Sequence, residues 1–458
     1  MSSAVSQTTV IKKEDKQVKM TVKTKLPVKK FENRESLLTD LFQNPHIKTV
    51  QHIFIALFLG LLANRLALDS TNFKKSFLGL RLIKLSFDKL HVVLLVWTLQ
   101  FVCTCLVFVF FHVWARVRLS FNPKTKSRKL WDVGWIATVF FYYVFGFRTT
   151  ASFVNDFKLP VASAAILTLE TTRMLMKVHS FIRENVEKVL LYKEKTDETL
   201  SLPKFSSYLY FSFAPTLLYR DEYPRTPSIR WKFVLENLVQ IVLIVLTYSV
   251  VFENILIPWF EEFGIRKYTI WETITCISQT CIPAMLLKLC TFYLILHCWQ
   301  NMFSELLRFG DRLFYRDWWT VTTYGEYFRT WNILVGDWLY TYIYKDMYEI
   351  VVPRNKLAAK MAVFVVSAVV HEYVLTYMFG FFFPFLFILF LFGGAGLSYA
   401  TVPKNNLLNI LFWYGLSVGT GMLVSMYSFE FMARANNPTL NPSFADFFIP
   451  RFFRYIEM

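Results

Sequence analysis

The stretch Val363–Tyr377 reads VFVVSAVVHEYVLTY and has the apolar pattern of a membrane-spanning helix. His371 and Glu372 lie near its middle. Ionisable residues at that depth are costly, and their presence indicates a functional site. Because the low dielectric disfavours imidazolium, His371 is expected to be neutral and able to accept a proton. The stretch therefore predicts a membrane protein in which His371 acts as a general base on a hydroxyl group.

The rest of the chain has the same apolar character. Of its 458 residues, 55% are apolar and 18% are charged, and the mean hydropathy is +0.37. Soluble domains are about 45–50% apolar and about 25% charged. About twenty apolar residues span a bilayer, and nine stretches qualify: 50–68, 90–115, 131–150, 160–182, 232–257, 274–299, 358–378, 379–400 and 407–428. We expect an all-α, polytopic membrane bundle of about nine transmembrane helices.

Two polar regions interrupt this pattern. Residues 1–48 are Lys-rich and predict a disordered basic cytosolic tail, with a short amphipathic helix at Leu37–Phe42. Residues 49–458 are expected to form one membrane-embedded domain, because no linker or internal repeat divides them. Segment 300–357 is too polar to span a membrane, and its aromatic residues recur at helical spacing. It predicts interfacial helices along the cytosolic face.

The formal charge of +17 follows the loops. Segments 116–130 and 183–231 are rich in Lys and Arg, so the positive-inside rule places them and the N-terminus in the cytosol. Nine crossings then leave the C-terminus lumenal. This distribution explains the charge without a nucleic-acid partner. The six cysteines show no CxxC spacing, so we expect buried free thiols and no metal site.

Alternatives to a general base at His371 follow from its neighbours. A packing histidine is the simplest. Ser367, one helical turn earlier, faces the same side, but no nucleophile elbow supports a Ser–His nucleophile pair. Glu372 projects about 100° away from His371 around the helix. His297, near the end of another span, is expected to be structural.

Two aromatic motifs precede this helix. They are FYRDWW at 314–319 and YFRTWN at 327–332. Arginine and tyrosine side chains in such a segment suit a nucleotide that carries phosphates. An interfacial aromatic belt explains the same pattern, and spacing leaves both interpretations open. Asn332, which ends the second motif, could orient a substrate carbonyl or hydroxyl group.

Together, FYRDWW, YFRTWN and the intramembrane HEY resemble the membrane-bound O-acyltransferase family, in its sterol and diacylglycerol O-acyltransferase branch. The longer stretches 213–231, 296–319, 329–346 and 366–373 are similar to the sterol enzymes, the acyl-CoA:cholesterol acyltransferases. The resemblance runs from about residue 205 to about residue 445. One departure is Gly336, where the sterol enzymes usually have histidine.

The resemblance implies an enzyme that transfers a long-chain acyl group from acyl-CoA to the 3-hydroxyl of a sterol, at the endoplasmic-reticulum membrane. It implies that His371 and Asn332 are catalytic. Acyl-CoA is then a substrate, and no cofactor is expected. Expected partners are acyl-CoA, a sterol, membrane lipid and a second copy, as a homodimer or homotetramer. Candidate acyl-CoA contacts or chamber residues are Tyr327, Arg329, Trp331, Tyr344, Lys356 and Ser367.

Two alternatives stay open at this point. In the first, the fold is the same and the acceptor is diacylglycerol, so that the product is triacylglycerol. In the second, the protein is a non-enzymatic sterol-binding or transport protein. Transport predicts broken helices in repeated halves, and the sequence shows no such repeat.

Overall fold

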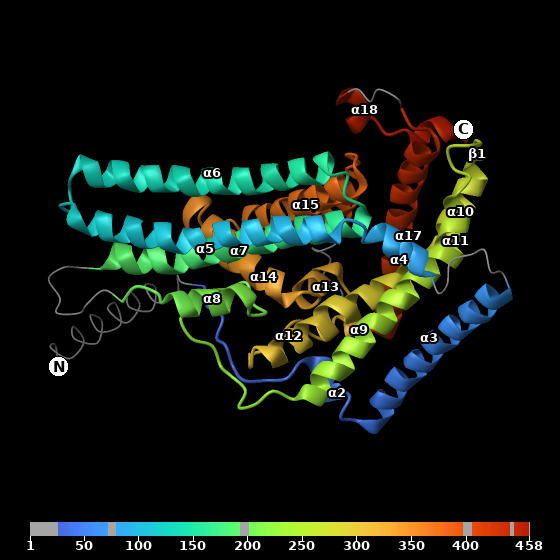
Figure 1. Cartoon of the computed structure of the whole chain (residues 1–458), viewed down its shortest axis with the longest axis horizontal. Helices are drawn as coiled ribbons and strands as arrows, with labels where there is room; N and C mark the ends of the chain where they lie inside the picture. Colours follow the sequence, from blue (N-terminus) through green and yellow to red (C-terminus); the bar gives the residue numbers. More distant parts are fainter. Residues whose placement is uncertain (1–25, 72–78, 193–200, 397–404, 440–443, 458) are drawn as a thin grey trace, which may run out of the picture.

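The computed structural model describes residues 26–71, 79–192, 201–396, 405–439 and 444–457. Within these ranges the fold is a bundle of helices (Figure 1). The only paired strands described are β1 (Tyr268–Thr269) and β2 (Ile456–Glu457), which run parallel. The predicted all-α class is confirmed.

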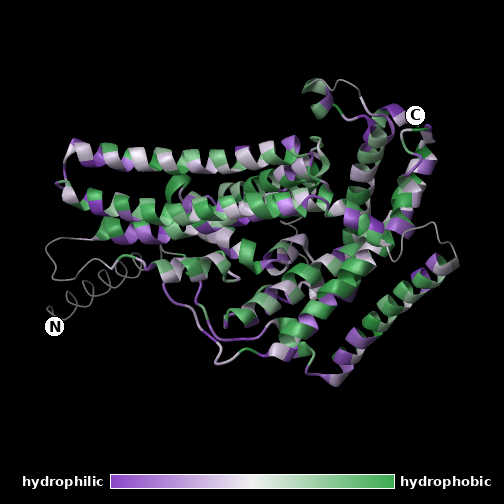
Figure 2. Cartoon of the chain, in the orientation of Figure 1, coloured by the Kyte–Doolittle hydropathy of each residue, from purple (hydrophilic) through white to green (hydrophobic). Residues whose placement is uncertain are grey.

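Among the described residues, seven helical stretches are long and apolar enough to cross a membrane: Pro45–Ser70, Leu80–Ser120, Lys126–Asp156, Trp231–Phe260, Ile270–Leu306, Lys356–Phe379 and Asn406–Asn436. They match seven of the nine predicted spans. Their outward faces carry large hydrophobic side chains, for example Phe140 and Phe141 at 67% and 66% exposure. Figure 2 marks in green the hydrophobic residues along the long helices. The chain is a multi-pass membrane protein.

The other two predicted spans differ from the expectation. Stretch 160–182 lies in α7 (Val161–Leu191), which carries charged residues inside the protein. Arg173 pairs with Glu170, and the Lys177 ammonium donates to the Phe211 and Ala214 carbonyls at 2.6 and 2.7 Å. In stretch 379–400, the described residues after the end of α15 form the short α16 (Phe385–Ile388) and the π-helix η7 (Leu389–Ala395).

The long helices form two groups (Figure 1). The first contains α5 (Leu90–Ser120), α6 (Lys126–Asp156) and α7, which pack together with α8 (Phe205–Phe213) around Phe111, Phe181 and Tyr208. The second contains α3 (Pro45–Thr71), α9 (Trp231–Val251), α11 (Ile270–Thr291) and α17 (Asn406–Asn436).

Helix α15 (Lys356–Phe379) joins the two groups. It packs against α7 on one side and against η5 (Tyr340–Tyr344) and η7 on the other. Asn355 caps its start, where the Asn355 side chain accepts a hydrogen bond from the Ala358 amide at 3.0 Å. Gly380 ends it in the left-handed conformation, with φ of +79°, which glycine adopts without steric cost.

Segment 300–357 forms short helices, but its aromatic residues differ from an interfacial belt. Tyr327, Trp338 and Tyr342 are buried, and Trp318 is 1% exposed. These rings pack into the protein because the short helices fold back between the two groups. The helices are α12 (Gln300–Leu306), the 3-10 helix η4 (Trp318–Thr320), α13 (Tyr324–Thr330), α14 (Ile333–Leu339), η5 and η6 (Met347–Val351).

Short elements complete the described chain. They are α2 (Leu37–Leu41), α4 (Leu80–Ser86), η2 (Phe252–Leu256), α10 (Ile257–Phe260), η3 (Phe292–Trp299), α18 (Phe444–Phe448) and η8 (Phe452–Tyr455). Helix α2 confirms the predicted short helix at the end of the tail.

All six cysteines are free, but only Cys276, Cys290 and Cys298 are buried, so the prediction of buried thiols is wrong for the other three.

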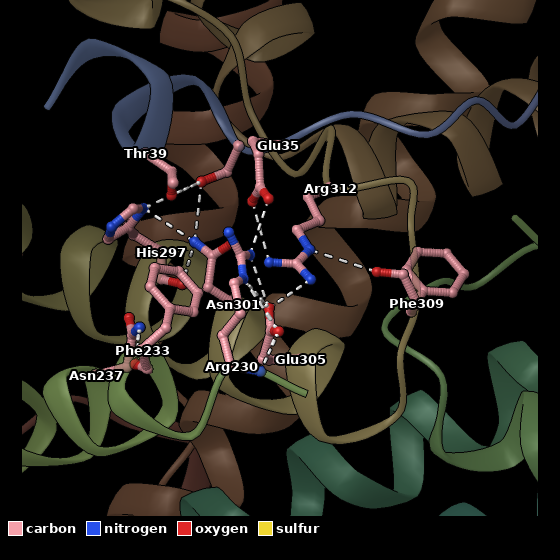
Figure 3. Close-up of polar contacts among 11 residues, drawn as sticks. Glu35, Thr39, Arg230, Phe233, Asn237, His297, Asn301, Glu305, Phe309 and Arg312 are labelled. Atoms are coloured by element: carbon pink, nitrogen blue, oxygen red, sulfur yellow. Dashed lines mark hydrogen bonds and ion pairs between the residues drawn. The ribbon is translucent and has the colours of Figure 1, made fainter. Parts of the chain in front are cut away.

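Part of the expected disordered tail is ordered. Residues 1–25 lie outside the described residues, whereas residues 26–36, here called the strap, cross one end of the bundle. Arg34 contacts Asp311 at 2.8 Å, and Glu35 contacts Arg230 and Arg312 at 2.8 and 3.0 Å. Figure 3 shows that Arg230 and Arg312 also contact Glu305. We call this end of the bundle the strap face.

The opposite end of the bundle holds the C-terminal residues. Asn436 donates hydrogen bonds to the carbonyls of Glu261 and Phe263 at 2.8 and 2.9 Å. Because α9 begins at the strap face and leads through α10 to Glu261, these contacts lie across the bundle from the strap.

Candidate active site

His371 lies on the face of α15 that also carries Ser367. Its Nδ1 atom is 2.7 Å from the Ser367 carbonyl oxygen and 3.5 Å from the Ser367 hydroxyl. A carbonyl oxygen only accepts hydrogen bonds, so Nδ1 carries the ring proton. The Nε2 atom is therefore left with a lone pair that can accept a proton. His371 is exposed, so a substrate can reach it.

Glu372 points elsewhere. It is 5% exposed, in contrast to its accessible neighbour, which confirms that the two side chains occupy different faces of α15. Glu372 therefore does not share a small pocket with His371 as the partner of a histidine base.

Aromatic rings connect His371 to α13. The His371 ring stacks on Phe390 of η7, with centroids 5.7 Å apart. Phe390 contacts Phe328 of α13 at 5.1 Å and Phe364 of α15 at 5.5 Å. The three elements thus form one aromatic wall beside the imidazole.

Asn332 begins α14. Its side-chain oxygen accepts a hydrogen bond from the Val335 amide at 3.2 Å, as in a helix N-cap. This bond fixes the orientation of the amide group. In the part of the chain that the structure describes, Nδ2 has no hydrogen-bond acceptor, so its two hydrogens are free to bind a substrate oxygen.

The FYRDWW motif holds Asn332 from both sides. The Arg316 amide donates to the Thr330 carbonyl at 2.8 Å, and the Ile333 amide donates to the Phe314 carbonyl at 2.9 Å. Phe314, Tyr315 and Trp318 are buried, whereas Arg316 is exposed. Spacing left two interpretations open, a nucleotide contact and an interfacial aromatic belt. These three buried rings fit neither of them. They support the turn that carries Asn332.

Tyr327 and Trp331 form the packed wall next to Asn332. Trp331 contacts Trp318 at 4.7 Å and Tyr327 at 5.2 Å. The ammonium of Lys288, on α11, lies 5.5 Å from the Tyr327 ring centroid and 5.4 Å from that of Trp331. Lys288 interrupts the predicted apolar span 274–299. No pattern in the sequence connected Lys288 with Trp331.

The helices that carry the two catalytic candidates pack together. Leu334 and Val335 of α14 share a hydrophobic cluster with Val363 and Val366 of α15, around the buried Trp338. Asn332 and His371, which are 39 positions apart in the chain, therefore lie on elements that pack against one common hydrophobic cluster. Phe390 belongs to the same site and had no distinguishing signal in its apolar stretch.

The remaining predicted contacts are peripheral. Arg329 and Lys356 are exposed. Tyr344 stacks between Tyr340 and Tyr348, at 5.6 and 5.9 Å. Among the described residues, no hydrogen bond or ion pair joins Arg329, Tyr344 or Lys356 to Asn332 or His371.

His297 is structural, as expected. It is buried, and its Nδ1 atom lies 2.7 Å from the Tyr315 hydroxyl and 3.1 Å from the Asn301 amide nitrogen. The same Nδ1 atom lies 3.5 Å from the hydroxyl of Ser36 in the strap, and Figure 3 shows His297 near Thr39 of α2. Within the described ranges, no group of three or more His, Cys, Asp or Glu side chains could hold a metal ion.

Comparison with known proteins identifies the family of the chain. A sequence model of the membrane-bound O-acyltransferase family matches residues 82–429. Sterol O-acyltransferase 1 of Cricetulus griseus is 39% identical over 426 residues, which cover 92% of this chain and 77% of that protein. Sterol O-acyltransferase 2 of Homo sapiens is 36% identical and covers 92% of this chain and 80% of its own length. The chain therefore belongs to the membrane-bound O-acyltransferase family, in its sterol O-acyltransferase branch.

Proposed function

We propose that this protein is a sterol O-acyltransferase, which transfers a long-chain acyl group from acyl-CoA to the sterol 3-hydroxyl to give a steryl ester and CoA. The observation that carries the proposal is the hydrogen bond from His371 Nδ1 to the Ser367 carbonyl. It leaves Nε2 as the proton acceptor on an accessible ring inside a membrane-spanning helix, where a sterol hydroxyl can approach from the lipid. The relatives are named sterol O-acyltransferases, and these names support a sterol as the acceptor.

The chemistry is a direct transfer. His371 Nε2 removes the hydroxyl proton as the sterol oxygen attacks the thioester carbonyl carbon. Asn332 Nδ2 donates to the carbonyl oxygen as negative charge develops there. The new C–O bond forms, the C–S bond breaks, and the proton held by His371 passes to the departing CoA thiolate.

The supporting residues have graded roles in this proposal. Trp331 and the buried Tyr327 form the wall of the acyl chamber, and Ser367 fixes the His371 ring through its carbonyl. Arg329, Tyr344 and Lys356 contact the CoA portion; their accessibility supports this assignment. Gly336 leaves open space one turn after Asn332, because a Cβ atom there would meet nothing within 4 Å.

Membrane placement completes the proposal. The strap face lies in the cytosol, where acyl-CoA is available, and the C-terminal residues lie in the lumen of the endoplasmic reticulum. The basic loops 116–130 and 183–231 support this orientation. Assembly as a homodimer or homotetramer is part of the same proposal and rests on the family resemblance.

The test is expression in cells that lack steryl esters, with wild type, His371→Ala, Asn332→Ala and the control His46→Ala. His46 is an exposed histidine at the start of α3. We expect steryl esters with wild type and His46→Ala, and none with well-expressed His371→Ala.

Two results would contradict the proposal in different ways. Triacylglycerol without steryl ester would show that the acceptor is diacylglycerol. Equal ester formation by wild type and His371→Ala would show that the base lies elsewhere.

A further inference from the structure

Lys288 occupies an unusual place for a cation. It lies eighteen residues from either end of the membrane-spanning stretch Ile270–Leu306, about 27 Å at the helical rise per residue. A lysine side chain near a helix end can place its ammonium in the membrane interface, but both ends of this stretch are too far from Lys288 for this. A cation at such depth usually faces the protein interior and has a partner.

The partners of Lys288 are ring faces and no carboxylate. Its ammonium lies above Tyr327 and Trp331, at 5.5 and 5.4 Å from their centroids. Among the residues that the structure describes, Lys288 forms no ion pair and no hydrogen bond. Aromatic faces attract a cation but leave its net charge uncompensated. The Lys288 ammonium therefore has no acidic partner among the described residues.

This charge lies beside the proposed reaction centre. Trp331 directly precedes Asn332, whose free amide hydrogens face the substrate oxygen in the proposed mechanism. Tyr327 precedes Phe328, which reaches His371 through Phe390. The two rings that hold the ammonium thus lie in and directly after α13, next to Asn332 and to the aromatic wall beside His371. In a low dielectric a charge acts over longer distances than in water, because solvent does not screen it.

We propose that Lys288 is an electrostatic positioning residue for acyl transfer. Its ammonium, held on Tyr327 and Trp331, supplies positive potential at Asn332 and favours the negative charge that develops on the thioester oxygen. Lys288 also favours binding of a fatty acid, whose carboxylate is anionic, over binding of the corresponding neutral fatty alcohol. The inference rests on the proposed acyltransferase function and assigns no bond-making step to Lys288.

The experiment uses the purified full chain in lipid nanodiscs, with Lys288→Met, Lys288→Arg and the control Lys232→Met. Methionine keeps the length of the side chain without the charge, and arginine keeps the charge. Lys232 is 91% exposed and lies on α9. We measure kcat and KM for acyl-CoA, and inhibition by oleate and by oleyl alcohol.

We expect Lys288→Met to lower kcat about tenfold with KM for acyl-CoA within about twofold, a smaller loss than for a direct oxyanion donor. It should also abolish the preference for oleate over oleyl alcohol. Lys288→Arg should keep most of the activity and the preference, and Lys232→Met should behave as wild type.

Two results would overturn the inference. One is a Lys288→Met protein with wild-type kcat and wild-type preference for oleate. The other is equal impairment of the methionine and arginine variants, which would indicate a steric role. Thermal unfolding verifies that each variant is folded, with Lys288→Leu as a second neutral variant. Wild type that forms no steryl ester would instead contradict the proposed function.

Discussion

The ammonium of Lys29 lies 2.5 Å from the carboxylate of Asp337, and both side chains are partly buried. Lys29 belongs to the strap, and Asp337 lies on α14, five residues after Asn332. The pair therefore joins the N-terminal region to the helix that Asn332 caps. The strap also contacts η6, where Glu349 accepts a hydrogen bond from the Leu26 amide at 3.0 Å.

Lys29→Met should loosen the strap. A partly buried ion pair contributes roughly 1 kcal/mol, so we expect faster proteolysis within residues 26–36 and a loss of activity of about twofold to fivefold. Limited proteolysis and kcat measure these effects. Lys30→Met, at the exposed neighbouring residue, is the matched control. Equal proteolysis rates in both variants would show that the Lys29–Asp337 pair does not hold the strap.

Glu305→Gln should destabilise the protein. Glu305 is fully buried and lies 2.7 Å from the guanidinium groups of both Arg230 and Arg312 (Figure 3). Removing one member of a buried ion-pair network costs up to about 3–5 kcal/mol, and Glu35, which still contacts both arginines, offsets part of this cost. Thermal unfolding of the variant should shift strongly, and that of Glu236→Gln, at an exposed residue, should not. Wild-type stability for Glu305→Gln would refute this view of the network.

Two glycines should respond oppositely to alanine. At Gly421, on α17, a Cβ atom would lie 2.7 Å from the Cys281 Cα of α11, so Gly421→Ala must push these helices apart. We expect a cost of about 1–3 kcal/mol. At Gly336 a Cβ atom meets nothing within 4 Å, and Gly336→Ala should stabilise α14 by about 0.5–1 kcal/mol. Thermal unfolding of the two variants side by side tests this contrast, and a stabilised Gly421→Ala or a destabilised Gly336→Ala would disprove it.

Ser367→Ala should retain catalysis. His371 Nδ1 donates to the Ser367 main-chain carbonyl, which alanine keeps, and the hydroxyl lies farther away at 3.5 Å. We expect kcat to fall less than about tenfold, against at least about a hundredfold for His371→Ala. If Ser367→Ala were as inactive as His371→Ala, a nucleophilic serine would have to be reconsidered.

Stability should depend on pH through Asp446. Hydrogen bonds from the Arg451 guanidinium hold the pKa of the Asp446 carboxyl below its ordinary value, although partial burial opposes this. A lowered pKa contributes stability above the ordinary pKa, about 3.9, that is lost as the pH falls below it. Asp446→Asn should therefore unfold at a lower temperature than wild type at pH 6, and the difference should narrow towards pH 3.5. A constant difference would exclude Asp446 as its source.

Much of the fold followed from local patterns. Seven of the predicted spans recur because a bilayer requires about twenty apolar residues whatever surrounds them. The pattern was less informative for α7, whose Lys177 donates to the carbonyls at the end of α8, and for η7, which is too short to recognise by length. In both places the cost of a polar or short segment is met by neighbours that are distant in sequence.

The sequence by itself determined that this is a multi-pass helical membrane protein and that His371, Ser367 and Asn332 are the residues to examine. The length of an apolar segment and the chemistry of a residue are local properties, so the amino-acid sequence alone is enough to identify them. Only the tertiary structure decided which nitrogen of His371 is free, that FYRDWW supports Asn332 instead of forming a lipid-facing belt, and that Lys288 lies over Trp331. These features depend on distances between helices, which packing sets and no local pattern contains.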